Sequence, residues 1–196
     1  SAYNITNSSG TTTIAAILGG SANLTKSGAG TLTLSGNNTY TGTTTINAGT
    51  ITVTHNNGLG SVSGGTIVNV GATLDLYSVT VGAEPITLAG GTLSDLTSSL
   101  LGSITLTADS TLNAESGDTL TLYGVISGAY GINKTGAGTV VLANVNTFTG
   151  TTVVSAGTLN VTGTLSDSTA VTVASGATYI VGANDTVASI AGAGNI

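Results

Sequence analysis

A long internal repeat constrains this chain more than any other feature. Residues 24–53 and residues 132–161 align without a gap, and 16 of the 30 aligned positions are identical. The only two lysines, Lys26 and Lys134, are one repeat position seen twice. Self-similarity at a fixed offset, here about 108 residues, is typical of architectures in which like units stack on one another.

A shorter repeat lies inside the long one: a small residue, then Thr, then an aliphatic or aromatic residue. Its successive copies are nearly evenly spaced, which indicates a coil of about 20 residues per turn with occasional loop insertions. A fainter copy stands near Thr12. The threonines of the pattern are Thr31, Thr50, Thr73, Thr92, Thr111, Thr139, Thr158 and Thr178.

The local pattern predicts short β-strands. Stretches such as TLTLSG and TLTLYG alternate Leu with Thr, and Gly, Asn, Ser or Asp marks a turn after each stretch. Strands one turn apart would pair in parallel at about 4.8 Å, each turn burying its apolar side against its neighbours. We therefore expect an all-β fold, a right-handed parallel β-helix of roughly nine rungs that forms a single domain over residues 1–196. Its inward column would contain Leu32, Ile51, Leu74, Leu93, Leu112, Val140, Leu159 and Tyr179.

An antiparallel sandwich or barrel is the competing architecture, because it too is built from short strands with frequent turns. It does not account for the ungapped similarity between the two long copies. It also does not account for the nearly constant step between copies of the short repeat.

The composition excludes several classes of protein. The net charge is −6, and two lysines without any arginine cannot neutralise the phosphates of a nucleic acid. The absence of cysteine, with a single histidine, excludes zinc and iron–sulfur centres of the usual kind. No apolar run approaches the length of a membrane span, and nothing in the sequence points to a cofactor.

Residues 26–53 and 134–161 share the motif K-[ST]-G-A-G-T-x-x-L…N-T-[YF]-T-G-T-T…A-G-T-[LI]-x-V. This motif resembles the passenger-associated β-strand repeat of autotransporters. Residues 58–76 and 175–196 are similar to segments that follow the repeat in such passengers. The resemblance implies a right-handed parallel β-helix at the surface of a Gram-negative type of cell, or secreted from it. It also implies a stalk that takes part in passenger secretion and displays adhesive functions, and it brings no catalytic residues.

Candidate catalytic or metal-binding side chains are few. His55 follows the stretch TITVT at a turn, its nearest acid in the sequence is Asp75, and we interpret it as an exposed turn residue. Asp109, Glu115 and Asp118 form the one local acidic cluster, a composition suited at most to a weak calcium site. We interpret the acids as solvated turn residues and expect no enzyme, since hydrolysis of polysaccharides needs two acids that face one groove. The eight acids are Asp75, Glu84, Asp95, Asp109, Glu115, Asp118, Asp167 and Asp185.

Two repeated pairs of residues receive structural interpretations. Lys26 and Lys134 precede GAG turns, and we expect each lysine to cover its turn with its aliphatic stem. Tyr40 and Phe148 occupy one repeat position. Aromatic rings can stack on sugars, but we expect these two rings to fill a corner between turns of the coil.

Pairs of threonine in the pattern T-x-T suggest a binding face. Residues i and i+2 of a strand share one face, so stacked pairs would form a flat array of hydroxyl and methyl groups similar to that of β-helical ice-binding proteins. Ladders of threonine that bond to one another are the alternative. The pairs are Thr31/Thr33, Thr43/Thr45, Thr50/Thr52, Thr52/Thr54, Thr105/Thr107 and Thr119/Thr121.

Together these observations predict a structural protein. We expect an extracellular shaft or filament segment of an adhesin-like assembly on a bacterial cell surface. Residues 17–24, 126–133 and 190–196 are similar in character, so the chain ends where a further copy of the repeat would begin. Because an open coil end exposes unpaired strand edges, we expect more of the same polypeptide or end-to-end association of copies, and the alternative is that something else covers both ends. The alternative function is a module that binds glycans, surface polymers or ice along one lateral face.

Overall fold

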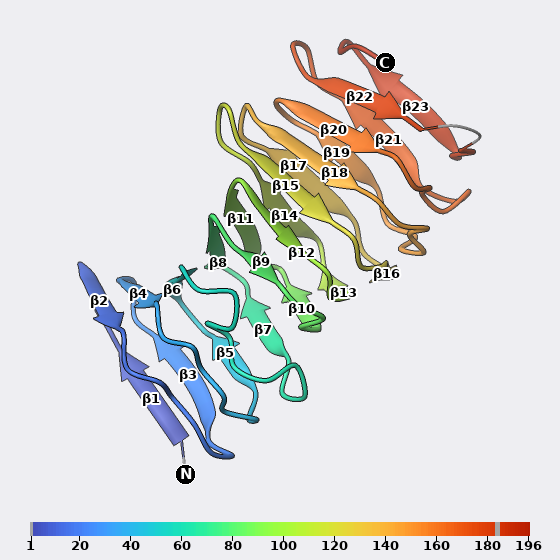
Figure 1. Cartoon of the computed structure of the whole chain (residues 1–196). Helices are drawn as coiled ribbons and strands as arrows, with labels where there is room; N and C mark the ends of the chain where they lie inside the picture. The colour runs from blue at the N-terminus through green and yellow to red at the C-terminus, as the bar shows by residue number, and fades with distance from the viewer. Residues whose placement is uncertain (1, 183–184) are drawn as a thin grey trace.

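The structure is a computed structural model that describes residues 2–182 and 185–196. These residues form short parallel strands and no helix. The strands stack in three sheets that run along the long axis of the molecule, with the two termini at opposite ends (Figure 1). Every pairing between two of these strands is parallel. The predicted parallel β-helix of about nine turns is confirmed, and the antiparallel alternative is wrong.

Sheet A forms one side of the coil from the N-terminus to beyond the middle, and sheet B forms a second side over the whole length. The strands of sheet A are, in stacking order, β1 (Ala2–Thr6), β3 (Asn23–Ser27), β5 (Thr44–Ile46), β7 (Thr66–Asn69), β10 (Ile86–Ala89), β13 (Ile104–Ala108) and β16 (Ile126–Gly128). The strands of sheet B are β2 (Thr11–Ile14), β4 (Thr31–Leu34), β6 (Gly49–Val53), β8 (Ala72–Tyr77), β11 (Thr92–Leu96), β14 (Ser110–Asn113), β17 (Ile132–Thr135), β19 (Thr152–Val154), β21 (Ala170–Val173) and β23 (Ser189–Gly192).

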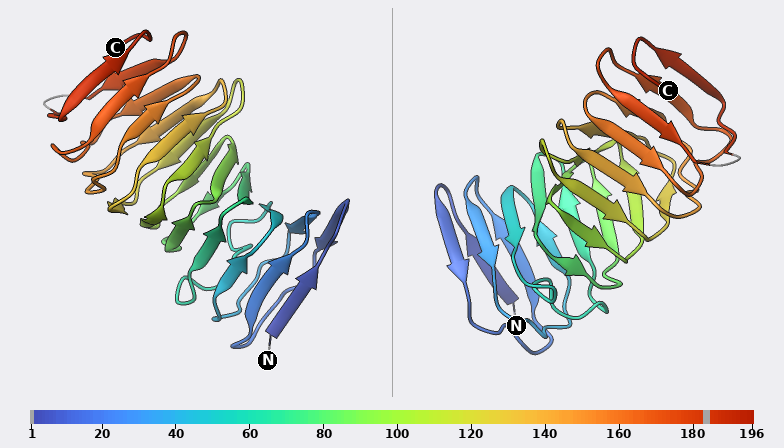
Figure 2. Two further views of the ribbon diagram at one scale, coloured as in Figure 1. Left: turned by 180° about the vertical axis from the view of Figure 1, so that it is seen from behind. Right: turned by 45° about the horizontal axis from the view of Figure 1, so that its top comes forward.

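Sheet C forms the third side and begins only near the middle of the chain. Its strands are β9 (Thr80–Val81), β12 (Ser98–Leu100), β15 (Thr119–Leu122), β18 (Thr139–Leu142), β20 (Thr158–Val161) and β22 (Thr178–Val181). Figure 2 shows the same stack from two further sides.

The coil therefore changes its cross-section along its length. Before β7 the chain alternates between sheets A and B, and loops such as 35–43 close the third side. From β7 to β18 it visits sheets A, B and C in turn. After β18 it alternates between sheets B and C, and loops such as 143–151 close the side that sheet A formed earlier. The first copy of the repeat thus lies on sheets A and B, and the second copy lies on sheets B and C.

The alternation of Leu with Thr explains why these segments form strands. In β4, Leu32 and Leu34 are fully buried, whereas Thr31 and Thr33 on the opposite face are half-buried. A strand places successive side chains on opposite faces, so each TLTL stretch supplies two leucines to the interior. Burial of each such leucine stabilises the fold by about 1.5–3 kcal/mol.

The predicted inward column exists as two pieces on different sheets. It breaks after Leu112, because Leu112 pairs with Lys134 of sheet B, whereas Val140 pairs with Leu120 of sheet C. The first piece is Leu32, Ile51, Leu74, Leu93 and Leu112 in sheet B, and the second is Val140, Leu159 and Tyr179 in sheet C.

Two details of the predicted register need correction. The longest step of the short repeat, from Thr111 to Thr139, crosses from one sheet to the next and omits Thr119, whose pairing partner in β18 is Thr139. Near the N-terminus, Thr31 pairs with Thr11, and Thr12 lies beside Leu32 at the inward position. The repeated threonines are thus the outward neighbours of the inward column, on sheet B in one half and on sheet C in the other.

Candidate functional site

The two lysines lie inside the coil, where each holds a turn. Lys26 is fully buried, and its Nζ donates hydrogen bonds to the carbonyl oxygens of Ser27 (3.0 Å), Gly28 (2.6 Å) and Ala48 (3.1 Å). Ala48 belongs to the next turn of the coil, so one ammonium group joins two turns. We call this arrangement the lysine clamp.

Lys134 forms a second lysine clamp with the same geometry. Its buried Nζ donates to the carbonyl oxygens of Thr135 (2.6 Å), Gly136 (2.8 Å) and Ala156 (3.1 Å). We expected each lysine to cover its turn with its aliphatic stem; instead the side chain lies inside the coil, and its ammonium group binds the turn. Each lysine stands two residues after an inward position, Leu24 or Ile132, and alternation along the strand directs it inward as well.

Glycine is required in the turns that the lysine clamps hold. Gly49 has a φ of 68°, and a Cβ atom there would overlap the carbonyl oxygens of Gly28 and Gly30 in the turn before it. The equivalent Gly157 has a φ of 64° and meets the same obstruction in the second copy. The glycines of the motif therefore let two successive turns approach closely enough for one ammonium group to bind both.

Burial lowers the pKa of both ammonium groups. Loss of hydration lowers the pKa of Lys26, and it lowers the pKa of Lys134 to about 8, against the opposing influence of the Glu115 carboxylate. An ammonium group has three donors, and each lysine directs all three to main-chain carbonyls. The lysine clamps are therefore structural and leave no cation for a ligand.

Glu84 is a buried acid, contrary to the interpretation of the acids as solvated. It is 2% exposed, its Oε1 accepts a hydrogen bond from Thr66 Oγ1 at 2.8 Å, and its Oε2 has no partner among the described residues. Burial raises the pKa of Glu84 to about 7, although the hydrogen bond from Thr66 opposes the shift. Glu84 lies just before Pro85, in the turn that leads into β10.

Asp95 of β11 is the second buried acid, also 2% exposed. It pairs with Leu76 in the neighbouring turn, and neither of its carboxylate oxygens has a partner in the described part of the chain. Burial raises the pKa of Asp95 to about 6, although the nearby hydroxyl and amide of Ser98 oppose the shift, and the charges of Asp118 and Asp75 add a smaller contribution. Its inward direction could have been read from the sequence, because Asp95 stands two residues after the inward Leu93.

The cluster expected from Asp109, Glu115 and Asp118 does not converge on one point. Asp109 accepts a hydrogen bond from the amide of Gly131 at 2.7 Å, and Glu115 accepts one from the side chain of Asn113 at 2.9 Å. Within residues 2–182 and 185–196, no group of three acidic or histidine side chains has an arrangement that could hold a metal ion. The weak calcium site considered from the sequence has no geometric support.

His55 and Asp75 have separate partners. His55 is half-buried, and its Nδ1 accepts a hydrogen bond from the amide of Asn57 at 3.1 Å, as a residue within a turn. Asp75 accepts one from Thr52 Oγ1 at 3.1 Å on the outward face of sheet B. Of the remaining acids, Asp167 is exposed and Asp185 accepts from the amide of Leu165.

The threonine pairs stack over a short distance only. Thr-x-Thr pairs lie side by side in β2, β4 and β6, and the next turn replaces the second threonine with Asp75. Thr45 and Thr105 place their pairs on sheet A, and Thr119 places its pair on sheet C. The first threonine position nevertheless continues along sheet B as an outward column of Thr11, Thr31, Thr50, Thr73, Thr92 and Thr111.

A shallow groove of about 580 Å³ lies across the outward face of sheet C, where that sheet begins. Hydroxyl side chains of β9, β12 and β15 line it, together with the amide of Asn56 and the ring of Tyr123. No carboxylate is among the described residues that line it. Sequence reasoning missed this groove, because nothing in the residue pattern shows that sheet C starts beside the loop that carries Asn56.

The two segments that carry the lysine clamps both match a known family. The family model described as the passenger-associated-transport repeat matches residues 24–53 and 132–161. The chain therefore contains two copies of the passenger-associated-transport repeat. This confirms the resemblance seen in the sequence.

The passenger-repeat protein also resembles a curated adhesin. It is 37% identical to the adhesin BmaC autotransporter of Brucella suis biovar 1 (strain 1330) over 160 residues, which are 80% of this chain. The chain spans 4% of the length of that adhesin. No solved structure matches the passenger-repeat protein. Its described residues contain no helix with the length and apolar character that crossing a membrane requires.

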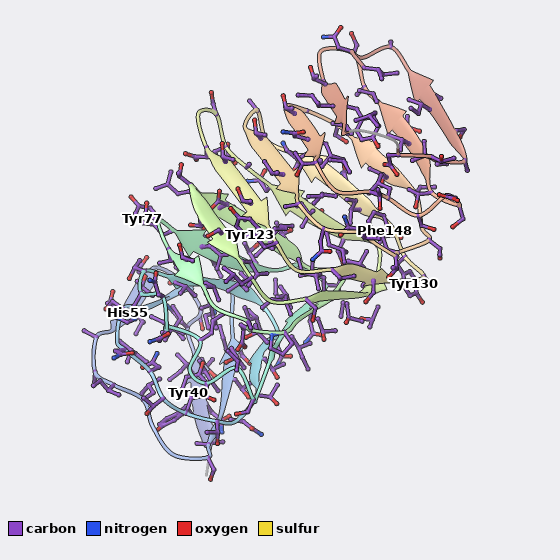
Figure 3. The ribbon with its side chains drawn as sticks, turned by 45° about the vertical axis from the view of Figure 1, so that its right-hand side comes forward. Tyr40, His55, Tyr77, Tyr123, Tyr130 and Phe148 are labelled. Atoms are coloured by element: carbon purple, nitrogen blue, oxygen red, sulfur yellow. The ribbon has the colours of Figure 1, made fainter. Side chains whose placement is uncertain are left out.

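The two repeats differ at their buried aromatic position. Tyr40 and Phe148 are both fully buried, which confirms that they fill interior space, and Figure 3 labels them among the other aromatic side chains. The hydroxyl groups of Tyr40 and Thr44 form a hydrogen bond of 2.6 Å in the first repeat. In the second repeat Phe148 has no hydroxyl group, and the buried Thr152 Oγ1 has no partner among the described residues.

Proposed function

We propose that this passenger-repeat protein is a stiff, non-catalytic shaft segment of a secreted adhesin at the bacterial cell surface. The observation that carries the proposal is the direction of the main-chain hydrogen bonds, which join each strand to the strand one turn away along the long axis. Bending such a coil would strain bonds in several sheets at once. The similarity to an autotransporter adhesin supports the location.

The lysine clamps support a mechanical role. Each clamp ties a turn to the next through a buried ammonium group, and hydrogen bonds to charged groups contribute about 1.5–3 kcal/mol each. The clamps lie far apart, in the first and second repeats, so each half of the coil has its own reinforcement. Both are shielded from solvent, which suits a protein exposed to changing conditions outside the cell.

We also propose that the shaft continues along its axis, through further turns of the same polypeptide or another copy. All four residues of β23 are exposed, and Ile190 there is 39% exposed although its register partner Val171 is buried. Gly192 of β23 has a φ of 119°, and Gly128 of β16, which precedes the second repeat, has a φ of 120°. The backbone conformation found before the second repeat therefore recurs in β23.

A tandem protein tests the shaft. Two copies of the chain joined end to end should form one rod whose maximum dimension, measured by small-angle X-ray scattering, exceeds that of a single copy by about 40 Å, the rise of nine turns. The rod should keep a constant cross-section. Two lobes at variable separation would contradict the proposal, because they would show that the turns of one copy do not stack on those of the next.

End-to-end association is tested with the single chain. If copies associate through β23, sedimentation velocity should show oligomers at high protein concentration, and Ile190→Lys should abolish them by placing a charge at the edge. Val70→Lys is the matched control, because Val70 is 77% exposed and lies in the turn between β7 and β8. A monomer at all concentrations would exclude association between copies and leave continuation of the polypeptide.

A further inference from the structure

We propose that the groove on sheet C binds an extended, electrically neutral oligosaccharide, a role beyond that of a shaft. The groove is open along its length and polar, and its volume of about 580 Å³ lies within the range of known ligand sites. An open groove suits a polymer segment that enters at one end and leaves at the other.

The floor of the groove is a column of hydroxyl groups in register. Thr80 pairs with Ser99, and Ser99 pairs with Thr121, so the three backbone positions repeat at the strand spacing of about 4.8 Å, and Ser99 Oγ donates a hydrogen bond to Thr80 Oγ1 at 3.3 Å. This step is comparable with the rise of one sugar residue in an extended chain. The next position in the column is Val141, and the hydroxyl column therefore ends where the groove ends.

An amide and an aromatic ring lie at the groove in addition to the hydroxyl groups. Asn56 accepts a hydrogen bond from the amide of Thr80 at 2.9 Å through its Oδ1, which leaves its side-chain nitrogen as a donor. Tyr123 is 53% exposed and presents its ring at the groove. Figure 3 shows Tyr123 well apart from Tyr130, which is on another part of the coil. Hydroxyl and amide groups beside an exposed aromatic face are the groups that recognise sugars.

The charges around the groove favour a neutral ligand. Both lysines of the chain are buried in their clamps, so neither is available to bind a sulfated or carboxylated sugar. Asp118 accepts a hydrogen bond from Thr97 Oγ1 at 3.3 Å at the edge of the groove, and the buried Asp95 lies three residues before Ser98, which lines the groove. Negative charge at this place would repel an anionic polymer.

The backbone under the groove is held in an unusual conformation. Ser78 and Thr97 have φ values of 52° and 48°, and they are the non-glycine residues with positive φ in the described part of the chain. Both line the groove, where each forms the corner between sheet B and sheet C in its own turn. A β-branched residue such as Thr97 adopts this conformation rarely, and strained positions of this kind cluster at binding sites. The conformation of Ser78 and Thr97 therefore holds the hydroxyl groups of the groove in place without a ligand.

Titration with oligosaccharides tests the proposal. The probes are β-1,4-linked oligomers of glucose, of mannose and of N-acetylglucosamine, with an oligogalacturonate of the same length as the anionic comparison. Isothermal titration calorimetry should show binding of at least one neutral probe and none of the oligogalacturonate. Tyr123→Ala should weaken that binding roughly tenfold. Thr121→Val, which keeps the shape of the strand and removes one hydroxyl group, should weaken it as well.

Tyr130→Ala is the matched control, because Tyr130 is 45% exposed and does not line the groove. It should bind the neutral probe as the unchanged chain does. The thermal unfolding temperature of each variant shows that the coil is intact. The proposal is overturned if no neutral probe binds, if the anionic probe binds equally well, or if intact Tyr123→Ala binds as the unchanged chain does.

Discussion

The interiors of the two repeats differ in one hydrogen-bonding group, the hydroxyl group of Tyr40, which Phe148 lacks. Tyr40 supplies a partner to Thr44, and Phe148 supplies none to Thr152, although the four side chains occupy equivalent positions. A buried polar group without a partner loses its hydrogen bonds to water and gains nothing in return. The second repeat therefore contains an unpaired buried hydroxyl group, that of Thr152, which a tyrosine at position 148 would pair as in the first repeat.

Phe148→Tyr should stabilise the protein. The new hydroxyl group would meet Thr152 as Tyr40 meets Thr44, with an expected gain of about 0.5–1.5 kcal/mol in the free energy of unfolding in urea. Tyr40→Phe is the reciprocal change and should cost a similar amount by leaving Thr44 unpaired. An unchanged or lower stability of Phe148→Tyr would show that the second interior has no room for the oxygen atom.

Glu84 makes stability depend on pH. Its pKa is about 7 in the folded protein and about 4.5 in an unfolded chain, so the folded state retains a proton that the unfolded state releases between these values. The free energy of unfolding contributed by Glu84 is therefore fully present below pH 4.5 and is lost as the pH rises through 7. Asp95, with a pKa of about 6, acts in the same direction over a lower interval.

The measurement is the thermal unfolding temperature from pH 4.5 to pH 8, for the unchanged chain and for Glu84→Gln. The unfolding temperature of the unchanged chain should fall as the pH rises. The unfolding temperature of Glu84→Gln should fall less, because the glutamine side chain does not ionise. Asp167→Asn is the control, since Asp167 is exposed. If Glu84→Gln and the unchanged chain show the same slope, Glu84 is ionised inside the folded coil.

Removal of a lysine clamp should be costly at either position. Lys26→Met and Lys134→Met keep most of the buried aliphatic volume but leave three carbonyl groups without their donor. We expect each to lower the free energy of unfolding by about 3 kcal/mol, measured by urea denaturation. A loss near zero would mean that the cost of burying the ammonium group cancels its hydrogen bonds.

A turn between two strands can require glycine for two reasons. The backbone can have a positive φ, or the neighbouring turn can leave no room for a Cβ atom. Gly49 and Gly71 both have positive φ, of 68° and 75°, but only Gly49 lies against carbonyl oxygens of a neighbouring turn. Gly71→Ala should therefore cost about 1 kcal/mol, which is the cost of the left-handed conformation alone. Gly49→Ala should cost about 3 kcal/mol, because overlap with the adjacent turn is added. Equal losses in urea denaturation would show that the adjacent turn yields.

The strands and their parallel direction could be predicted from the sequence. The alternation of apolar and polar residues marks each strand, and the nearly constant step between copies of the short repeat reflects pairing between neighbouring turns. The inward positions of Lys26, Lys134 and Asp95 also followed from alternation, but their polar character concealed it. The assignment of strands to sheets could not be predicted, since a turn with two strands and a turn with three have similar lengths. The groove depends on that assignment, and so it could not be predicted either.

The coil as a whole should open from its two ends. Strand β23 is exposed along its length, whereas β8 and β11 near the middle have fully buried inward residues such as Leu74 and Leu93. In a stacked array each turn is stabilised by its neighbours, and an end turn has only one. Hydrogen exchange measured by mass spectrometry should show the fastest strand amides in the end strands β1, β2 and β23 and the slowest in β8 and β11. Uniform exchange would mean that the coil unfolds only as one unit.

The second repeat is displaced by one sheet from the first, and a longer chain with the same spacing would repeat that displacement. Its third copy would lie on sheets C and A, and only the fourth would return to sheets A and B. The loops that close the open side would move with it, as loop 35–43 and loop 143–151 already do. In a fibre built in this way, the closing loops of successive copies would point in successive directions around the fibre axis. Every side of the fibre would then display such loops.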